Sequence, residues 1–278
     1  MRVVKAKHAG ACYGVQRALD MALEAAGRTE GASTRGPLIH NPQGGGELAE
    51  RGIRAVESVD AVDHGSVIIR SHGVTPGVRR SVEERGLPII DATCPHVARA
   101  QKAAAELARQ CGRVVVVGEA GHPEVEGLVA CAREAGGQVA VVTEPADLPD
   151  GLPAPVGIVV QTTQTRESLD AVVDALVARG IEPQVKNTIC FATRQRQEAA
   201  AALADEVDAI VVIGGRNSSN TTRLAEICAA ACSRTHHVEA PDELDPAWFE
   251  GCESVGVTAG ASTPEAQIAA VVDRLEAW

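Results

Sequence analysis

Aromatic side chains are scarce in this sequence of 278 residues, in which Phe, Trp and Tyr together make up 2% of the positions. The five aromatic residues are Tyr13, Phe191, Trp248, Phe249 and Trp278. The apolar content of 45% is therefore mostly Ala, Val, Leu and Ile. This composition excludes fibrous and disordered classes, and a core packed from aliphatic residues favours a layered α/β protein.

Long apolar runs and clusters of basic residues are also missing. No stretch approaches the roughly 18 consecutive apolar residues that cross a bilayer, and residues 1–8 lack the apolar segment of a signal peptide. We therefore expect a cytoplasmic protein with no membrane partner. The net charge is −11 and no Lys- or Arg-rich block occurs, so we expect no nucleic-acid partner.

Apolar strand-like runs alternate with alanine-rich helical stretches along the whole chain. The clearest strands are expected at 66–70, 87–90, 113–117, 156–160, 209–213 and 254–258. Helix-length segments at 97–110 and 194–206 lie between them. This β-α-β-α order predicts parallel sheets with helices on both faces.

Three of the eight cysteines, Cys12, Cys94 and Cys190, begin three related repeats, each where an extended run gives way to a helical one. Twenty-eight residues after each cysteine a polar residue follows a strand, in turn His40, His122 and Ser218. A second strand in each repeat ends in a polar loop, at 71–73, 161–163 and 259–262. Ligands bind beyond the carboxyl ends of parallel strands, so these loops predict one shared cavity.

A cysteine at a helix N-terminus has its thiolate stabilised by the helix dipole and by backbone N–H groups. Three such thiolates suit a four-iron cluster whose fourth iron stays open for substrate. Spacing alone leaves two alternatives, a zinc hydrolase with Cys and His ligands and a non-enzymatic iron–sulfur carrier or sensor. The other cysteines are expected to be small core residues: Cys111, Cys131, Cys228, Cys232 and Cys252. For Cys228 and Cys232, four residues apart, metal binding is the alternative.

The polar loops supply neutral or singly charged hydrogen-bond donors for an anion: His40, His72, His122, Ser218, Ser219, Asn220 and Ser262. Structural histidines and a plain helix cap at 219–222 are the alternatives. No P-loop is present, so a small phosphate ester or diphosphate is favoured over a nucleotide. Glu124, two residues after His122, is placed to donate a proton, or simply to complement a helix dipole.

Nine motifs, in order along the chain, resemble the 4-hydroxy-3-methylbut-2-enyl diphosphate reductase family over essentially the whole length. They are ACYGV at 11–15, HNPQ at 40–43, SHG at 71–73, DATCP at 91–95, GHPE at 121–124, QTT at 161–163, NTIC at 187–190, NSSN at 217–220 and TAGAS at 258–262. Nine ordered motifs are a highly specific signal.

The resemblance implies a trefoil of three pseudo-threefold-related αβα domains around one [4Fe-4S] cluster per chain. The implied domains are 13–93, 94–187, and 188–278 together with 1–12. Cys12, Cys94 and Cys190 are implied to hold the cluster. The implied diphosphate ligands are His40, His72, His122, Ser218, Ser219, Asn220 and Ser262, with Glu124 and Thr162 near the substrate hydroxyl.

The implied reaction is reductive dehydroxylation of the diphosphate to isopentenyl diphosphate and dimethylallyl diphosphate. It is the last step of the methylerythritol phosphate route to isoprenoids. The implied electron donor is a protein such as ferredoxin or flavodoxin.

The sequence departs from the family after position 43, where Gly44, Gly45 and Gly46 replace the usual Val pair. Each glycine weakens a helix by about 1 kcal/mol relative to Ala. We therefore expect a weak helix start at this point and a less rigidly positioned His40.

Overall fold

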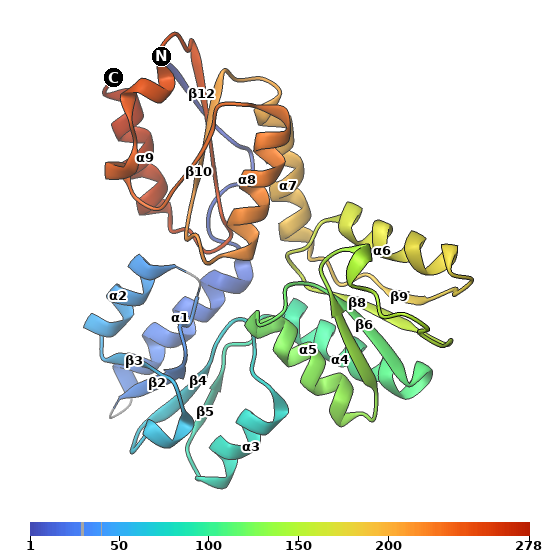
Figure 1. Ribbon diagram of the computed structural model, residues 1–278. Coiled ribbons are helices and arrows are strands. Elements are labelled where there is room, and N and C mark those ends of the chain that lie inside the picture. Colours follow the sequence, from blue (N-terminus) through green and yellow to red (C-terminus); the bar gives the residue numbers. More distant parts are fainter. Residues whose placement is uncertain (29–30, 40) are drawn as a thin grey trace. The chain divides into compact units, whose positions relative to one another are not determined.

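The computed structural model describes residues 1–28, 31–39 and 41–278 (Figure 1). These residues form three four-stranded sheets, and all the strand pairs are parallel. None of the helices in the described ranges is both long and apolar enough to span a membrane.

Packing divides the chain into two compact lobes, which we describe separately. The middle lobe contains Arg17–Leu38 and Leu48–Cys190. The terminal lobe contains Met1–Gln16, Ile39–Glu47 and Phe191–Trp278.

The first sheet of the middle lobe has the strand order β3-β2-β4-β5. Its strands are β2 (Ala32–Arg35), β3 (Ile53–Val56), β4 (Ser66–Ile69) and β5 (Ile89–Asp91). The helical segments along this part of the chain are α1 (Tyr13–Arg28), α2 (Pro42–Glu50), the 3-10 turn η1 (Val59–Ala61) and α3 (Pro76–Glu84). Val82 of α3 packs on Val67 of β4, so α3 covers one face of the sheet.

The second sheet of the middle lobe has the order β7-β6-β8-β9. Its strands are β6 (Arg113–Val117), β7 (Gln138–Val142), β8 (Gly157–Val160) and β9 (Gln184–Lys186). Its helical segments are α4 (Pro95–Cys111), α5 (Pro123–Glu134), η2 (Pro145–Asp147) and α6 (Arg166–Ala178). Alternate residues of β6 face opposite sides: Val114 and Val116 pack with α4 and α5, and Val115 and Val117 pack with α6. The sheet therefore lies between two helical layers (Figure 1).

The sheet of the terminal lobe has the order β1-β12-β10-β11. Its strands are β1 (Arg2–Lys5), β10 (Ala209–Ile213), β11 (Thr235–Val238) and β12 (Ser254–Ala259). Its helical segments are α7 (Phe191–Ala204), α8 (Ser219–Ala231), η3 (Pro241–Glu243), η4 (Pro246–Phe249) and α9 (Glu265–Glu276). Val211 and Ile213 pack with α9, whereas Ile210 and Val212 pack with α7 and α8 on the other face (Figure 1).

The three sheets share one topology. In each sheet, the first strand after the cysteine (β2, β6 or β10) lies between the next two strands along the chain. A fourth strand pairs with the second of these two and forms an edge of the sheet. The N-terminal β1 takes this fourth place in the terminal lobe by pairing with β12. The expected class, three α/β repeats with parallel sheets, is confirmed, whereas the domain boundaries at 13–93, 94–187 and 188–278 with 1–12 stay a prediction.

The helix α2 contains all three glycines of the 44–46 run, so the chain is helical there despite their low propensity. An added methyl group at Gly45 or Gly46 would meet no atom within 4 Å. We expect Gly45→Ala and Gly46→Ala each to raise the free energy of unfolding by about 0.5–1 kcal/mol, because Ala restricts the unfolded chain. Denaturant unfolding measures this change.

Gly52 is the matched control for this prediction. Its surroundings are equally open, but its φ of +84° lies in the left-handed region that disfavours Ala. Gly52→Ala should therefore lower the stability by about 1 kcal/mol. A loss of stability in the α2 variants as large as that of Gly52→Ala would contradict the prediction.

Candidate active site

The three cysteines lie in loops that are built alike. Cys12 and Cys190 directly precede α1 and α7, and Cys94 is the N-cap residue of α4, as the sequence predicts. Each cysteine N–H donates to a carbonyl two residues beyond the end of a strand, at 3.0 Å in all three cases: Cys12 to Ala261, Cys94 to Ser71 and Cys190 to Thr162. Each cysteine is therefore tied to the loop at the carboxyl end of β12, β4 or β8.

The chemistry of this donor set fits an iron–sulfur group. All three residues are half-buried and none forms a disulfide. The Cys94 side chain makes no N-cap hydrogen bond at the start of α4. Cys94 and Cys190 belong to the middle lobe and Cys12 to the terminal lobe. Within neither lobe do the described residues contain three His, Cys, Asp or Glu side chains grouped to hold a metal ion.

Glu124 is a buried carboxyl group of the middle lobe. It lies in the first turn of α5 and is only 1% exposed. Its Oε1 accepts a hydrogen bond from the Thr162 N–H at 2.6 Å, and its Oε2 lies 2.8 Å from Thr162 Oγ1. Burial raises the pKa of Glu124 to about 7, although the two bonds from Thr162 act in the opposite direction. The carboxyl group can therefore hold a proton at neutral pH.

The raised pKa of Glu124 predicts a pH-dependent stability. The folded chain binds this proton more tightly than the unfolded chain, whose carboxyl titrates near 4.5. The stabilisation is therefore complete below pH 4.5 and is lost as the pH rises through about 7. Relative to Glu124→Gln, which has no titrating proton, the wild type should lose on the order of 3 kcal/mol between about pH 4.5 and 8. Denaturant unfolding at both pH values measures the difference, and a constant difference would contradict the prediction.

Two of the predicted histidines lie together beside Glu124. His122 is the N-cap residue of α5, and its Nδ1 accepts a hydrogen bond from the Glu124 N–H at 3.1 Å. A neutral His122 ring must therefore carry its proton on Nε2, which makes that nitrogen a donor. The His72 ring lies edge-to-face with the His122 ring, with 5.6 Å between their centroids. The middle lobe thus brings His72, His122, Glu124 and Thr162 into one group.

The predicted polar residues of the terminal lobe gather at the start of α8 and after β12. Ser218 is the N-cap residue, and its Oγ accepts a hydrogen bond from the Thr221 N–H at 3.4 Å. Ser218, Ser219, Asn220 and Ser262 are all less than a tenth exposed. The cap is thus Ser218, just before the alternative cap segment at 219–222.

Asn220 stands out within this group because its side-chain amide is buried with neither its nitrogen nor its oxygen hydrogen-bonded. A buried polar group without a partner costs about 1–3 kcal/mol. Such a group is expected where a polar ligand completes the hydrogen bonds. His40, the remaining predicted residue, lies outside the described residues.

The other cysteines differ in their surroundings from the three that begin the repeats. Cys111, Cys228 and Cys232 are buried, as predicted for core residues, whereas Cys131 and Cys252 are only half-buried. Burial raises the pKa of Cys228 to about 12, and burial together with Glu134 raises that of Cys131 to about 11. These two sulfurs stay protonated at neutral pH.

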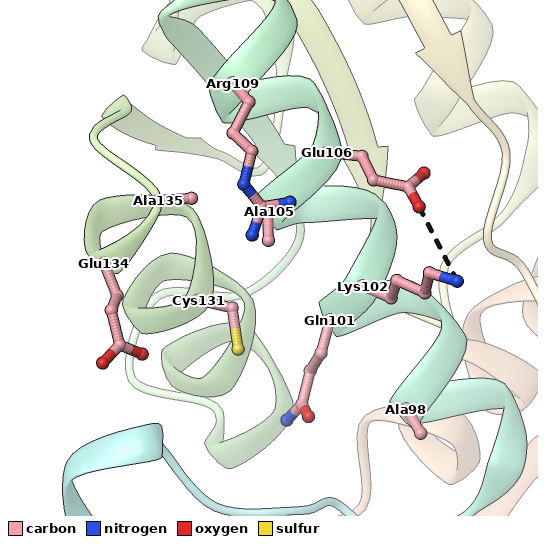
Figure 2. Close-up of a pocket in the computed structure, with 9 residues that line it drawn as sticks. All are labelled: Ala98, Gln101, Lys102, Ala105, Glu106, Arg109, Cys131, Glu134 and Ala135. Atoms are coloured by element: carbon pink, nitrogen blue, oxygen red, sulfur yellow. Dashed lines mark ion pairs between the residues drawn. The ribbon is translucent and has the colours of Figure 1, made fainter.

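A groove of about 540 Å³ runs between α4 and α5 of the middle lobe. Figure 2 shows Cys131 of α5 and Gln101 of α4 on the two sides of the groove, and the ion pair that Lys102 forms with Glu106 along α4. None of the predicted site residues lines this groove.

Gln161, which the sequence places in the polar loop at 161–163 without a role of its own, is also part of this arrangement. Gln161 is fully buried, its Oε1 accepts a hydrogen bond from the Glu119 N–H at 2.9 Å, and its Nε2 donates to Thr163 Oγ1 at 3.1 Å. It thereby joins the loops that follow β6 and β8. Its place between an apolar strand and two threonines was the available signal.

These observations define the class of the protein: an α/β protein of three parallel-sheet repeats, each beginning with a half-buried cysteine at the start of a helix. The family model described as LytB protein matches residues 3–276. The chain therefore belongs to the LytB family.

Relatives of similar length agree with this assignment. A 4-hydroxy-3-methylbut-2-enyl diphosphate reductase of Pelobacter propionicus is 49% identical over 277 residues, covering 99% of this chain and 98% of the relative. The reductase of Geotalea uraniireducens is 48% identical over 279 residues, covering 99% and 97%.

Two solved structures are also similar. One is described as (E)-4-hydroxy-3-methyl-but-2-enyl diphosphate reductase, the terminal enzyme of the non-mevalonate pathway. It is 41% identical with a TM-score of 0.73, and the match covers all of both chains. The reductase of Plasmodium falciparum is 24% identical with a TM-score of 0.90, covering 98% of this chain and 87% of that one, and it shows the shared fold.

Proposed function

We propose that this chain is a reductase that removes the hydroxyl group of 4-hydroxy-3-methylbut-2-enyl diphosphate, forming isopentenyl diphosphate and dimethylallyl diphosphate. Two electrons and two protons are consumed, and the hydroxyl oxygen leaves as water. The named relatives, similar in length and nearly half identical, support this reaction. The single observation on which the site assignment depends is the buried Glu124, held by Thr162 in a loop that also binds the Cys190 backbone.

Cys12, Cys94 and Cys190 are proposed to hold one [4Fe-4S] cluster per chain. Their equivalent loops, helix-start positions and half-burial support this role. When bound, the cluster would supply electrons one at a time and act as a Lewis acid toward the substrate hydroxyl. A ferredoxin or flavodoxin is the proposed electron donor.

The diphosphate is proposed to bind to His40, His72, His122, Ser218, Ser219, Asn220 and Ser262. The unsatisfied Asn220 amide supports this, because diphosphate oxygens accept the hydrogen bonds that its nitrogen lacks. The N-terminus of α8 provides backbone N–H groups and a favourable dipole for an anion. The Nε2 proton of His122 adds a further donor.

Glu124 and Thr162 are proposed to deliver the proton that releases the hydroxyl as water. Oε1 of Glu124 already accepts the Thr162 N–H, so the proton of a neutral carboxyl group is on Oε2. Oε2 then donates to Thr162 Oγ1, 2.8 Å away, which leaves the threonine hydroxyl free to donate onward. The two side chains thus form a short path for one proton, beginning at a group whose pKa is about 7.

The test is anaerobic purification with counting of iron and acid-labile sulfide, followed by turnover of the diphosphate with a chemical reductant. We expect about four irons and four sulfides per chain and formation of both products. Zinc without sulfide would favour a hydrolase instead. A cluster that the substrate does not oxidise would favour an iron–sulfur carrier. A colourless, inactive protein would overturn the proposal.

A further inference from the structure

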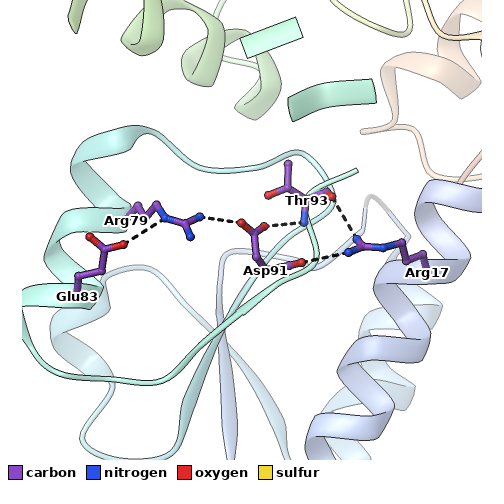
Figure 3. A network of polar contacts seen from close by, with 5 residues as sticks. All are labelled: Arg17, Arg79, Glu83, Asp91 and Thr93. Carbon is purple, nitrogen blue, oxygen red and sulfur yellow. Dashed lines mark hydrogen bonds and ion pairs between the residues drawn. The ribbon is translucent and has the colours of Figure 1, made fainter. Parts of the chain in front are cut away.

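The segment that leads into Cys94 is held from two sides (Figure 3). On one side, the Asp91 carboxylate accepts hydrogen bonds from the Thr93 N–H at 3.0 Å and from Arg79 Nη1 at 2.7 Å. On the other side, Arg17 of α1 donates from Nη1 to the Thr93 carbonyl at 3.2 Å and from Nη2 to the Asp91 carbonyl at 3.5 Å. Arg17 therefore bonds only to the backbone of this segment, whereas Arg79 bonds to a side chain.

Arg17 bonds the carbonyl end of a peptide unit whose N–H end is already hydrogen-bonded. The Thr93 carbonyl and the Cys94 N–H belong to the same planar peptide, and the N–H donates to the Ser71 carbonyl at 3.0 Å. A peptide plane bonded at both ends cannot turn without losing a hydrogen bond. The direction in which the Cys94 Cα presents its sulfur is thereby restricted.

The peptide between Asp91 and Ala92 is also bonded at both ends. Arg17 donates to the Asp91 carbonyl, and the Ala92 N–H of the same peptide donates to the Ile69 carbonyl at 3.0 Å. One guanidinium group thus spans two carbonyls, which its planar arrangement of donors permits and a lysine ammonium does not reproduce.

The terminal lobe has a related contact at another cysteine, in which an arginine bonds one carbonyl of the segment before it. Arg196 of α7 is 7% exposed and donates from Nε and Nη2 to the Gly10 carbonyl at 3.0 and 2.7 Å. Gly10 lies two residues before Cys12, whose N–H donates to Ala261. Arg17 follows Cys12 by five residues and Arg196 follows Cys190 by six. In both lobes, an arginine on the helix after one cysteine bonds to the segment before another.

The loop before the third cysteine, Cys190, is held by a threonine side chain. Arg99, which follows Cys94 by five residues, is exposed, and its Nη2 lies 2.9 Å from His96 Nδ1. The Cys190 loop is instead bonded through Thr188, whose Oγ1 accepts the Val160 N–H at 3.0 Å.

We infer that Arg17 is a positioning residue for Cys94, because it fixes the loop in which the Cys94 thiolate keeps the orientation of a cluster ligand. This inference rests on the proposed function of Cys94 in holding an iron–sulfur cluster. Partners beyond the ligands themselves typically change metal affinity by 10- to 100-fold when they are removed. A purely structural arginine would change the unfolding temperature without changing the hold of the protein on its cluster.

Arg17→Gln tests the inference, with Arg85→Gln as the matched control. Arg85 also bonds a backbone carbonyl of the middle lobe, that of Val62 at 2.7 Å, away from the cysteines. In the cluster-loaded protein, Arg17→Gln should lose its cluster absorbance to an iron chelator about 10-fold faster than the wild type. Arg85→Gln should lose it at the wild-type rate. Arg17→Lys keeps the positive charge and one donor group. Its rate of cluster loss should lie between those of Arg17→Gln and the wild type.

A second measurement does not depend on the cluster. In the full chain without iron, alkylation of Cys94, followed by peptide mass spectrometry, should be several-fold faster in Arg17→Gln than in the wild type, because the loop opens more often. Alkylation of Cys131 in the same sample should be unchanged.

Wild-type rates of both cluster loss and Cys94 alkylation in Arg17→Gln would overturn the inference, as would equal increases in Arg85→Gln. If Arg17→Gln does not fold, Arg17→Lys decides by the same two rates. A wild type that binds no cluster would overturn the proposed function, whereas the alkylation rate would still judge the role of Arg17 in holding the loop.

Discussion

Glu124→Gln is expected to lower the rate of turnover by about 10² to 10⁴, the usual effect of removing a general acid. The substitution preserves the shape of the site. A glutamine oxygen can still accept the Thr162 N–H, and its amide nitrogen can donate to Thr162 Oγ1, so both contacts of the carboxyl group are retained in form. What the variant lacks is a proton that can be transferred. Cluster content and binding of the diphosphate should therefore stay at wild-type levels.

Glu126→Gln is the control for this prediction. Glu126 lies in the same first turn of α5 but is exposed. It shares with Glu124 any favourable interaction with the helix dipole, which is worth about 0.3–1 kcal/mol at an exposed position. If complementing the helix dipole were the function of Glu124, Glu124→Gln and Glu126→Gln would have similar rates of turnover. A near-normal rate in single-turnover experiments with Glu124→Gln would exclude the proposed role.

Cys190→Ser is expected to abolish activity, with a loss of more than about 100-fold, and to deprive the protein of its iron. A serine hydroxyl does not ionise near neutral pH and is a poor ligand for iron in a sulfide cluster. The fold should survive, because Cys190 contributes to its loop through a backbone N–H that serine also has. Iron and sulfide content, visible absorbance and circular dichroism together separate loss of the cluster from loss of the fold.

Cys131→Ser provides the comparison. Cys131 is also a half-buried cysteine of the middle lobe, but the pKa of its thiol is raised to about 11, so it is not available as a thiolate. This variant should keep its colour and its activity. If Cys190→Ser also kept both, Cys190 would not be a cluster ligand.

Sequence patterns predicted some strands well and others not at all, and burial explains the difference. The strands at 113–117 and 209–213 are predicted with the bounds of β6 and β10, because strands covered by helices on both faces are continuously apolar. The edge strand β9 is exposed throughout and was not predicted. The central β2 was also missed, since its buried residues include Ser33 and Thr34, which carry no apolar signal.

The sequence by itself determined the features that depend on local order: three repeats with a cysteine at the start of a helix, their parallel strands, and the polar residues that follow those strands. Chain spacing and periodicity are local properties, so they could be predicted without coordinates. For the same reason, Cys94 lies at the start of a helix as predicted, and His122 and Ser218 follow strands as predicted.

Only the tertiary structure decided which of these features meet. Thr162 lies 38 residues from the carboxyl group it contacts, and Arg17 lies 76 residues from the carbonyl before Cys94. The pKa of Glu124 likewise depends on water being excluded around it, a property of the packed lobe and not of its neighbours in the chain. Pairing between distant segments and desolvation both arise from the path of the whole chain, which no local pattern encodes.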